Sequence, residues 1–175
     1  LIPNRMLRND GGRRFQDVTT AGGFGHLQKG HGIAFGDLDN DGDQDVYTSM
    51  GGAYEGDVYY NALFENPGYS NDWLKLKLVG VKSNRAAIGA RIKVTVATSG
   101  GKHVIYKTIN SGATFGCSPL RQEVGLGKAN AVESVEIWWP TSGIRQTLTG
   151  LDKNQCYAIR EDENKATPLT LKNFK

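Results

Sequence analysis

The 175-residue chain lacks the features that mark helical membrane proteins and nucleic-acid-binding proteins. No stretch approaches the ~20 apolar residues that a membrane-spanning helix requires, and no long segment repeats its apolar residues with helical spacing. Lys and Arg are scattered, without the basic run interleaved with aromatic residues that would follow a phosphate backbone. We therefore expect no membrane span and no nucleic-acid partner.

Cysteine is scarce, since Cys117 and Cys156 are the two cysteines of the chain. There is no CxxC pair and no histidine nearby, so the sequence gives no sign of a zinc site. In an oxidising compartment the two cysteines are able to form a disulfide. Cys156 also reads as a small buried hydrophobe within a strand. Both interpretations stay open.

Catalytic signatures are missing as well. His26, His31 and His103 are far apart in the sequence, and no P-loop, dinucleotide fingerprint or nucleophile elbow is present. Glu133 and Glu136 flank a predicted strand on its solvent side, and an exposed strand face explains them without an acid pair. We expect that the chain is not an enzyme.

Glycine and short apolar segments dominate what is present. The chain has 23 glycines, and 38% of its residues are hydrophobic. The apolar segments are short and bounded by turn residues, which is typical of an all-β protein. In WLKLKLV, Leu74, Leu76 and Leu78 alternate with Lys75 and Lys77, which predicts a half-buried strand with the lysines on its solvated face.

Two parts of the chain differ in texture. The first part, residues 1–68, is predicted to be a propeller-type repeat, because an internal echo, NRMLRNDGG from Asn4 and NALFENPGY from Asn61, has a spacing of 57 residues that is typical of propeller arrays. The predicted strands of this part are RRFQDVT, GHGIAFGD and DVYTSM. Residues 69–163 contain six or more short strands, including ARIKVTV, HVIYKTI, RQEVGLG, VESVEIWWP and QCYAIRE. This spacing predicts an antiparallel β-sandwich or barrel, and we expect a loosely ordered tail over residues 164–175.

The densest charge lies in FGDLDNDGDQDVY, which holds five aspartates in nine positions: Asp37, Asp39, Asp41, Asp43 and Asp45. Carboxylates this close repel one another unless a cation lies among them. Ca²⁺ takes about six to eight oxygen ligands in flexible geometry. With this spacing the alternate carboxylates of Asp37, Asp39 and Asp41 turn inward, and Gly42 permits a tight bend. Asp43 then offers its main-chain oxygen and Asp45 closes the shell, so the sequence predicts a calcium site.

The loop is not an EF-hand. Thr48 stands where an EF-hand has its bidentate Glu, and the flanking GIAFG and DVYTSM read as strands. Mg²⁺ is less suited than Ca²⁺, because it retains its waters and seldom uses an all-protein cage. The alternative is a solvated acidic turn without a metal.

Two adjacent tryptophans follow a strand-like segment. Alternation along VEIWW sends Trp138 and Trp139 to opposite faces, so we expect one in the core and the other facing solvent or a partner. An exposed Trp beside Lys and Arg is suited to stacking on a sugar ring. Packing in the core or between domains is the alternative.

Two blocks carry a family resemblance. NRMLRNDGGRRFQDVT…GHGIAFGDLDNDGDQDVY resembles an FG-GAP or VCBS-like repeat, as in integrin-type propellers and bacterial surface proteins. NDWLKLKLVGVKSNRAAIGARIKVTV, INSGATFGCS, EVGLGKANAVESVEIWWPTSGIRQTLTGL and NQCYAIRE resemble the ASPIC and UnbV domain, which is also present in cartilage acidic protein. One departure is SGATFGCS, where Phe115 and Cys117 replace an expected Tyr or Leu and a polar residue.

The resemblance implies the last repeat of a β-propeller followed by an ASPIC module, at the C-terminal end of a longer extracellular, cell-surface or periplasmic protein. The aspartates at 37, 39, 41 and 45 match the calcium ligands of the repeat, and Asp43 matches its backbone-donor position. The start of the chain at Leu1, without Met or a leader, agrees with an excised portion.

Together these observations predict a non-enzymatic, calcium-stabilised binding or adhesion module. The expected partners are the rest of the parent propeller and a protein or glycan at the cell surface. The alternatives are a carbohydrate-binding module that uses an exposed Trp, and an accessory domain of a secreted enzyme.

Overall fold

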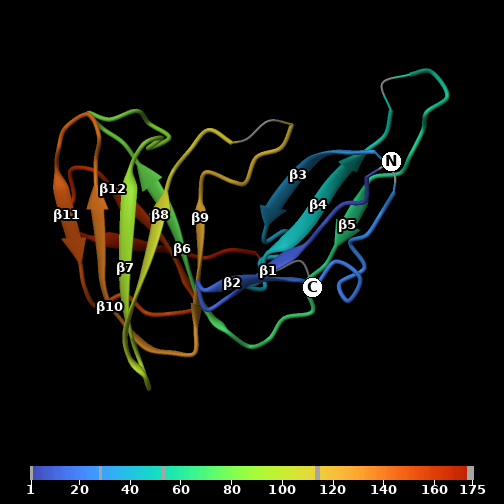
Figure 1. The fold of residues 1–175 in the computed structure, drawn as a ribbon. Helices are drawn as coiled ribbons and strands as arrows, with labels where there is room; N and C mark the ends of the chain where they lie inside the picture. The colour runs from blue at the N-terminus through green and yellow to red at the C-terminus, as the bar shows by residue number, and fades with distance from the viewer. Residues whose placement is uncertain (1, 28, 53, 113–114, 173–175) are drawn as a thin grey trace. The chain divides into compact units, whose positions relative to one another are not determined.

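The computed structural model describes residues 2–27, 29–52, 54–112 and 115–172, and these residues form an all-β structure without helices (Figure 1). The described residues group into two compact units. The first unit contains residues up to 34, residues 46–64 and a short segment that ends at Cys117. The second contains residues 35–45, residues 65–112 and the chain from Ser118 onward. The domain boundaries at residues 68 and 163 stay predictions.

The second unit is a sandwich of two four-stranded sheets. One sheet has the order β11-β10-β7-β8 and the other the order β13-β12-β6-β9. The strand bounds are β6 (Asp72–Val79), β7 (Arg91–Thr98), β8 (Gly101–Thr108), β9 (Gln122–Gly127), β10 (Ala129–Trp138), β11 (Arg145–Leu148), β12 (Gln155–Arg160) and β13 (Ala166–Leu169). Neighbouring strands are antiparallel except β12 and β6, which run parallel. Of the two predicted architectures, the sandwich is confirmed.

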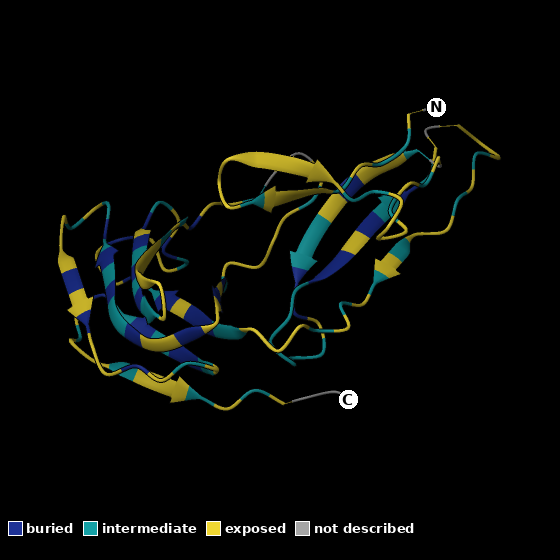
Figure 2. Cartoon of the chain, turned by 60° about the horizontal axis from the view of Figure 1, so that its bottom comes forward, coloured by how far each residue is buried: buried dark blue, intermediate teal, exposed yellow. Residues whose placement is uncertain are grey.

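Alternating apolar residues from both sheets build the core of the sandwich. On β6, Leu74 and Leu76 are fully buried and Leu78 is 5% exposed. Val94 and Val96 on β7 belong to the same core cluster, as do residues of β9, β10, β11 and β12. Figure 2 shows this burial as dark blue bands along the strands of the sandwich. The period of two read from the sequence therefore places these side chains in the core.

The two tryptophans at the end of β10 face opposite sides, as predicted. Trp139 is fully buried, and its Nε1 donates a hydrogen bond to Gln146 Oε1 at 2.9 Å. Trp138 is half-buried, with the Cζ of Arg91 5.0 Å from its ring centroid. The indole that enters the core thus keeps a partner for its N–H, as burial of this polar group requires.

Two predictions about exposure and order are wrong. Lys75 is fully buried although alternation predicts a solvated side chain, whereas Lys77 on the same strand is exposed as expected. The predicted loose tail contains β13, whose Ala166 pairs with Ile159 and whose Leu169 pairs with Cys156. The tail is ordered there because the backbone of β12 offers it a free ladder of donors and acceptors.

A buried carboxylate fixes the turn that follows β6. Glu161 is 2% exposed, and its Oε2 accepts the backbone N–H groups of Val81, Lys82 and Ser83 at 2.6 to 2.9 Å. Its Oε1 accepts the hydroxyls of Ser83 and Ser142 at 2.8 and 2.6 Å. Burial alone would raise the pKa of Glu161, but these hydrogen bonds lower it to about 2.

The first unit contains a two-stranded hairpin and a three-stranded sheet of order β3-β4-β5. The strand bounds are β1 (Leu7–Asp10), β2 (Arg14–Asp17), β3 (Gly30–Gly36), β4 (Asp45–Met50) and β5 (Ala62–Phe64). Val46 and Met50 are buried, whereas Leu7, Phe15 and Leu63 are each more than half exposed. None of the described residues of this unit joins the core cluster. Few of the described side chains of this unit are therefore shielded from solvent by the unit itself.

Both cysteines are free thiols in this structure. Cys117 is exposed, and Cys156 lies on β12 with 2% exposure. Burial raises the pKa of the Cys156 thiol. Of the two interpretations that the sequence left open, the small buried hydrophobe describes Cys156.

Candidate metal centre

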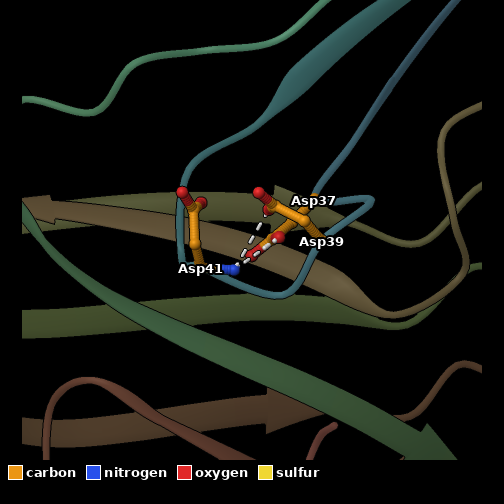
Figure 3. A group of neighbouring side chains, drawn as sticks. All are labelled: Asp37, Asp39 and Asp41. Carbon is orange, nitrogen blue, oxygen red and sulfur yellow. Dashed lines mark hydrogen bonds between the residues drawn. The ribbon is translucent and has the colours of Figure 1, made fainter. Parts of the chain in front are cut away.

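The acidic loop, residues 37–45, leaves β3 after Gly36 and enters β4 at Asp45. Oxygen atoms from Asp37, Asp39 and Asp41 all lie within 4.8 Å of one another. Figure 3 shows the three side chains on one loop of the chain, with Asp37 and Asp39 on the side opposite Asp41. The structure thus brings together three of the five predicted ligands, and they are the three that the alternating pattern turns inward.

Backbone N–H groups of the loop hold these carboxylates in place. Asp37 accepts hydrogen bonds from the N–H of Asp41 at 3.1 Å and of Gly42 at 2.8 Å. Asp41 in turn accepts the N–H of Asp43 at 3.1 Å, and its own N–H also lies 3.3 Å from Asp39 Oδ1. Dashed lines in Figure 3 mark the bonds from Asp41. The backbone of the loop therefore holds the carboxylates in place, and the same hydrogen bonds stabilise the turn.

Asp45 closes the loop at its far end. It is 4% exposed, and its two carboxylate oxygens accept the N–H groups of Leu38 at 3.0 Å and Asn66 at 2.9 Å. Asp45 and Asp43 lie outside the cluster of three carboxylates. Their roles as further calcium ligands stay predictions.

The loop requires a glycine at position 42 for two reasons, the backbone conformation and the close approach of the Trp73 side chain. Its φ angle is +107°, a conformation that L side chains rarely adopt. A Cβ at this position would collide with the indole of Trp73 on β6. The loop and β6 belong to one compact unit, and the glycine lets the loop backbone pack directly on the strand.

Lys75 supplies a cation to this cluster. Its ammonium group donates to Asp37 Oδ2, and both side chains are fully buried. The ammonium nitrogen also lies 4.6 Å from the centroid of the Trp73 ring, close enough for a cation–π interaction. A buried ammonium is stable when it is paired and hydrogen-bonded, and Asp37 meets this requirement.

The strands beside β6 contribute further buried polar groups. Glu123 on β9 and Cys156 on β12 are the direct cross-strand neighbours of Lys75. Glu123 is 8% exposed and pairs with Arg121 at 2.8 Å. Burial raises the pKa of Glu123, although the neighbouring Arg121 opposes that shift.

Sequence reasoning missed Lys75. Its spacing on β6 is the same as that of Lys77, so no local pattern distinguishes the buried lysine from the exposed one. The available signal was the charge balance: a loop with five carboxylates needs positive charge, and a lysine elsewhere in the chain can provide part of it.

The donor set of the loop fits a hard divalent cation. Three converging carboxylates offer the oxygen ligands that Ca²⁺ prefers. Asp39 and Asp41 are partly exposed to solvent, and a hollow of about 340 Å³ beside the loop is lined by Gly42, Asp43 and Trp73 among others. Lys75 already neutralises part of the charge on Asp37, so an arriving ion would share this carboxylate.

The glutamates considered as an acid pair lie in ordinary surface ion pairs. Glu133 contacts Lys102 and Glu136 contacts Lys93, each at 2.7 Å. Both carboxylates belong to β10 and are partly exposed. This is the exposed strand face that the sequence predicts.

The outer face of the β11-β10-β7-β8 sheet carries a shallow cavity of about 500 Å³. Trp138 pairs across the strands with Arg145 and Arg91, and the cavity wall also includes the exposed Tyr106. Aromatic rings and cations therefore lie together on a solvent-accessible sheet face.

Two family models match the chain. One, described as an FG-GAP-like repeat, matches residues 3–48, and the other, described as ASPIC and UnbV, matches residues 80–166. The acidic loop lies inside the first match. FG-GAP repeats are of the β-propeller type and commonly bind calcium.

A comparison with curated proteins found no match. Across the described residues, no helix has the length and hydropathy needed to cross a bilayer. Domains of the two matched kinds are typical of extracellular or secreted proteins. The chain carries an FG-GAP-like repeat followed by an ASPIC and UnbV domain, the order that its two sequence blocks predict.

Proposed function

We propose that the chain is a non-enzymatic binding module of an extracellular protein and that calcium stabilises its acidic loop. The observation that carries this proposal is the convergence of Asp37, Asp39 and Asp41 within 4.8 Å. Their position inside an FG-GAP-like repeat supports the same reading.

The ligands would come from a single loop. The carboxylates of Asp37, Asp39 and Asp41 would hold the ion, with the main-chain oxygen of Asp43 and the carboxylate of Asp45 completing the shell as the sequence predicts. A bound Ca²⁺ supplies charge neutralisation and crosslinks the turn. The backbone bonds to Asp37 and Asp45 already set the course of the loop, so the ion would stabilise an existing conformation.

The expected contribution of calcium is modest. Extracellular calcium modules often bind with dissociation constants of about 10⁻⁴ to 10⁻³ M. At a calcium concentration about ten times the dissociation constant, linkage adds roughly 1.4 kcal/mol to the free energy of unfolding. This is enough to order a loop and far too little to hold a whole domain.

Thermal unfolding with and without calcium tests the proposal. Wild-type protein should unfold at a higher temperature with 10 mM calcium chloride than with a chelator. Asp41→Asn removes a ligand charge at the same size and should abolish most of that difference. Equal melting curves for the wild type with and without calcium would contradict calcium stabilisation.

A second candidate function, carbohydrate binding, is favoured by the cavity around Trp138. The half-buried indole lies beside Arg91 and Arg145, where a sugar ring would find an apolar surface and hydrogen-bond donors together. We propose acidic saccharides as the ligands, because the wall of the cavity carries more positive than negative side chains. Its Glu136 is already paired with Lys93.

A glycan array on the folded protein tests this second candidate. Binding to uronic-acid or sulfated saccharides should be lost in Trp138→Ala and retained in Tyr69→Ala, which removes an exposed aromatic outside the cavity. No binding to any acidic or neutral glycan, or equal binding by both variants, would remove the candidate.

A further inference from the structure

We propose that Lys75 is a resident counter-ion of the acidic loop: its ammonium group keeps the loop folded without calcium and lowers the affinity with which calcium binds. The second half of this inference rests on the proposed calcium site, whereas the first half can be tested in a chelator. It identifies a residue of the sandwich sheet, distant in sequence, as the group that tunes the loop.

Burial makes the ion pair between Lys75 and Asp37 significant. Neither side chain is accessible to solvent, in contrast to the exposed ion pair of Arg5 with Asp17. An exposed ion pair contributes little to stability. Removing one partner of a buried pair is strongly destabilising, because the other charge is left buried without a partner. Asp37 therefore depends on Lys75 whenever no other cation is near.

The position of Lys75 is fixed by the sheet. Its Cα lies in the middle of β6, between Cys156 of β12 and Glu123 of β9, and Leu74 and Leu76 on either side are buried in the sandwich core. The strand cannot shift by one residue without moving these leucines out of the core. The ammonium group is held in addition by the face of Trp73, the ring on which Gly42 packs.

This fixed cation has two opposite effects on the loop. Without calcium it neutralises Asp37 and so permits the turn to form. With calcium it remains close to the ion and repels it, because Asp37 is shared between the two. Removing the charge should therefore destabilise the calcium-free loop and strengthen calcium binding at the same time, a combination that loss of ordinary packing would not produce.

The test compares Lys75→Met with Lys77→Met. Methionine retains the length of the side chain and removes its charge, and Lys77 is an exposed lysine on the same face of the same strand. In a chelator, Lys75→Met should unfold at a clearly lower temperature than the wild type, while Lys77→Met should be unchanged.

Calcium titration calorimetry supplies the second readout. Lys75→Met should bind calcium about tenfold more tightly than the wild type, because a positive charge close to the ion has been removed at low effective dielectric. Lys77→Met should bind like the wild type. Equal or weaker binding by a folded Lys75→Met would overturn the part of the proposal that concerns affinity.

A double variant keeps the proposal falsifiable if Lys75→Met does not fold alone. Lys75→Met combined with Asp37→Asn removes both charges and should regain, in a chelator, most of the stability that the single variant loses. Failure to regain it would mean that Lys75 acts through packing, and would contradict the counter-ion role.

These outcomes separate the two proposals. If the wild type shows no calcium binding, the proposed calcium site fails, but the unfolding temperatures in chelator still decide whether Lys75 neutralises Asp37. If the wild type binds calcium and Lys75→Met leaves both affinity and chelator stability unchanged, the counter-ion proposal fails while the calcium site stands.

Discussion

The two compact units differ in how completely each buries its own side chains. The second unit encloses one apolar core between two four-stranded sheets, with Trp139, Leu74 and Leu76 fully buried. The first unit has a small sheet and a hairpin, and the described core cluster includes none of its residues. A sandwich of this size closes on itself, whereas one propeller-type repeat leaves its sheet faces for other repeats to cover.

The acidic loop is instructive because the sequence and the contacts assign it differently. It lies within the FG-GAP-like match at residues 3–48, yet residues 35–45 group with the sandwich unit. Within this unit, Lys75 and Trp73 of β6 contact the loop through the ion pair with Asp37 and the packing on Gly42. A family boundary drawn along the sequence thus need not coincide with the boundary of a folding unit.

The largest expected effect concerns the unequal cores. Leu76→Ala should lower the free energy of unfolding by about 3 kcal/mol, because it opens a cavity in a closed core. Leu63→Ala, in the exposed part of β5, should change it by less than about 0.5 kcal/mol. Urea unfolding followed by tryptophan fluorescence measures the effect of Leu76→Ala, since all three tryptophans belong to the second unit.

Hydrogen exchange of the backbone amides of β4 and β5 measures the effect of Leu63→Ala on the stability of the first unit. A loss of stability in Leu63→Ala as large as that in Leu76→Ala would show that the first unit has a core of its own. It would contradict the difference in burial between the two units.

The next effect concerns Glu161, whose pKa is lowered to about 2 from an ordinary value of 4.5. A lowered folded-state pKa contributes stability that is fully present above about pH 4.5 and is lost as pH falls toward 2. Glu161→Gln should cost about 2 to 3 kcal/mol near neutral pH, because an amide cannot accept all five hydrogen bonds.

The unfolding temperatures of wild type and Glu161→Gln between pH 2 and 7 check this assignment. The two curves should converge at the acid end. A constant gap across this range would mean that the cost of the substitution is steric and does not depend on the charge of Glu161.

The smallest of these effects concerns the fit of the loop to β6. Gly42→Ala should cost about 1 to 3 kcal/mol, because the new Cβ meets the Trp73 indole and the φ angle is strained. Gly100→Ala, in the turn between β7 and β8, is the matched control, since its Cβ would make an ordinary contact at 3.8 Å with the side chain of Thr98. A shift in Trp fluorescence and a weaker calcium response should appear in Gly42→Ala alone. Similar behaviour of both variants would show that the loop does not depend on this contact.

The sequence predicts much of this structure, because regular alternation reports burial. The strands β3, β4, β6, β7, β8, β9, β10 and β12 coincide with apolar or alternating runs, and the opposite orientations of Trp138 and Trp139 follow from the same rule. The converging carboxylates of Asp37, Asp39 and Asp41 also follow from their spacing.

The features that the sequence did not reveal depend on contacts between segments that are far apart in the sequence. Short strands such as β5, β11 and β13 have too few residues to show a period and form because a neighbour offers its edge. Lys75 and Glu161 look like surface residues, and each is buried because a partner distant in sequence satisfies its charge. Such partners become visible after the fold has brought the segments together.

The most direct measurement is a crystal structure of the wild-type protein grown with several millimolar calcium, with anomalous scattering used to identify the ion. We predict an ion among the carboxylates of Asp37, Asp39 and Asp41, with calcium–oxygen distances of about 2.3 to 2.6 Å and Lys75 still in contact with Asp37. An ordered loop in which Lys75 pairs with Asp37 and no calcium is bound at that concentration would contradict the central claim. The lysine would then be the cation that the acidic loop requires.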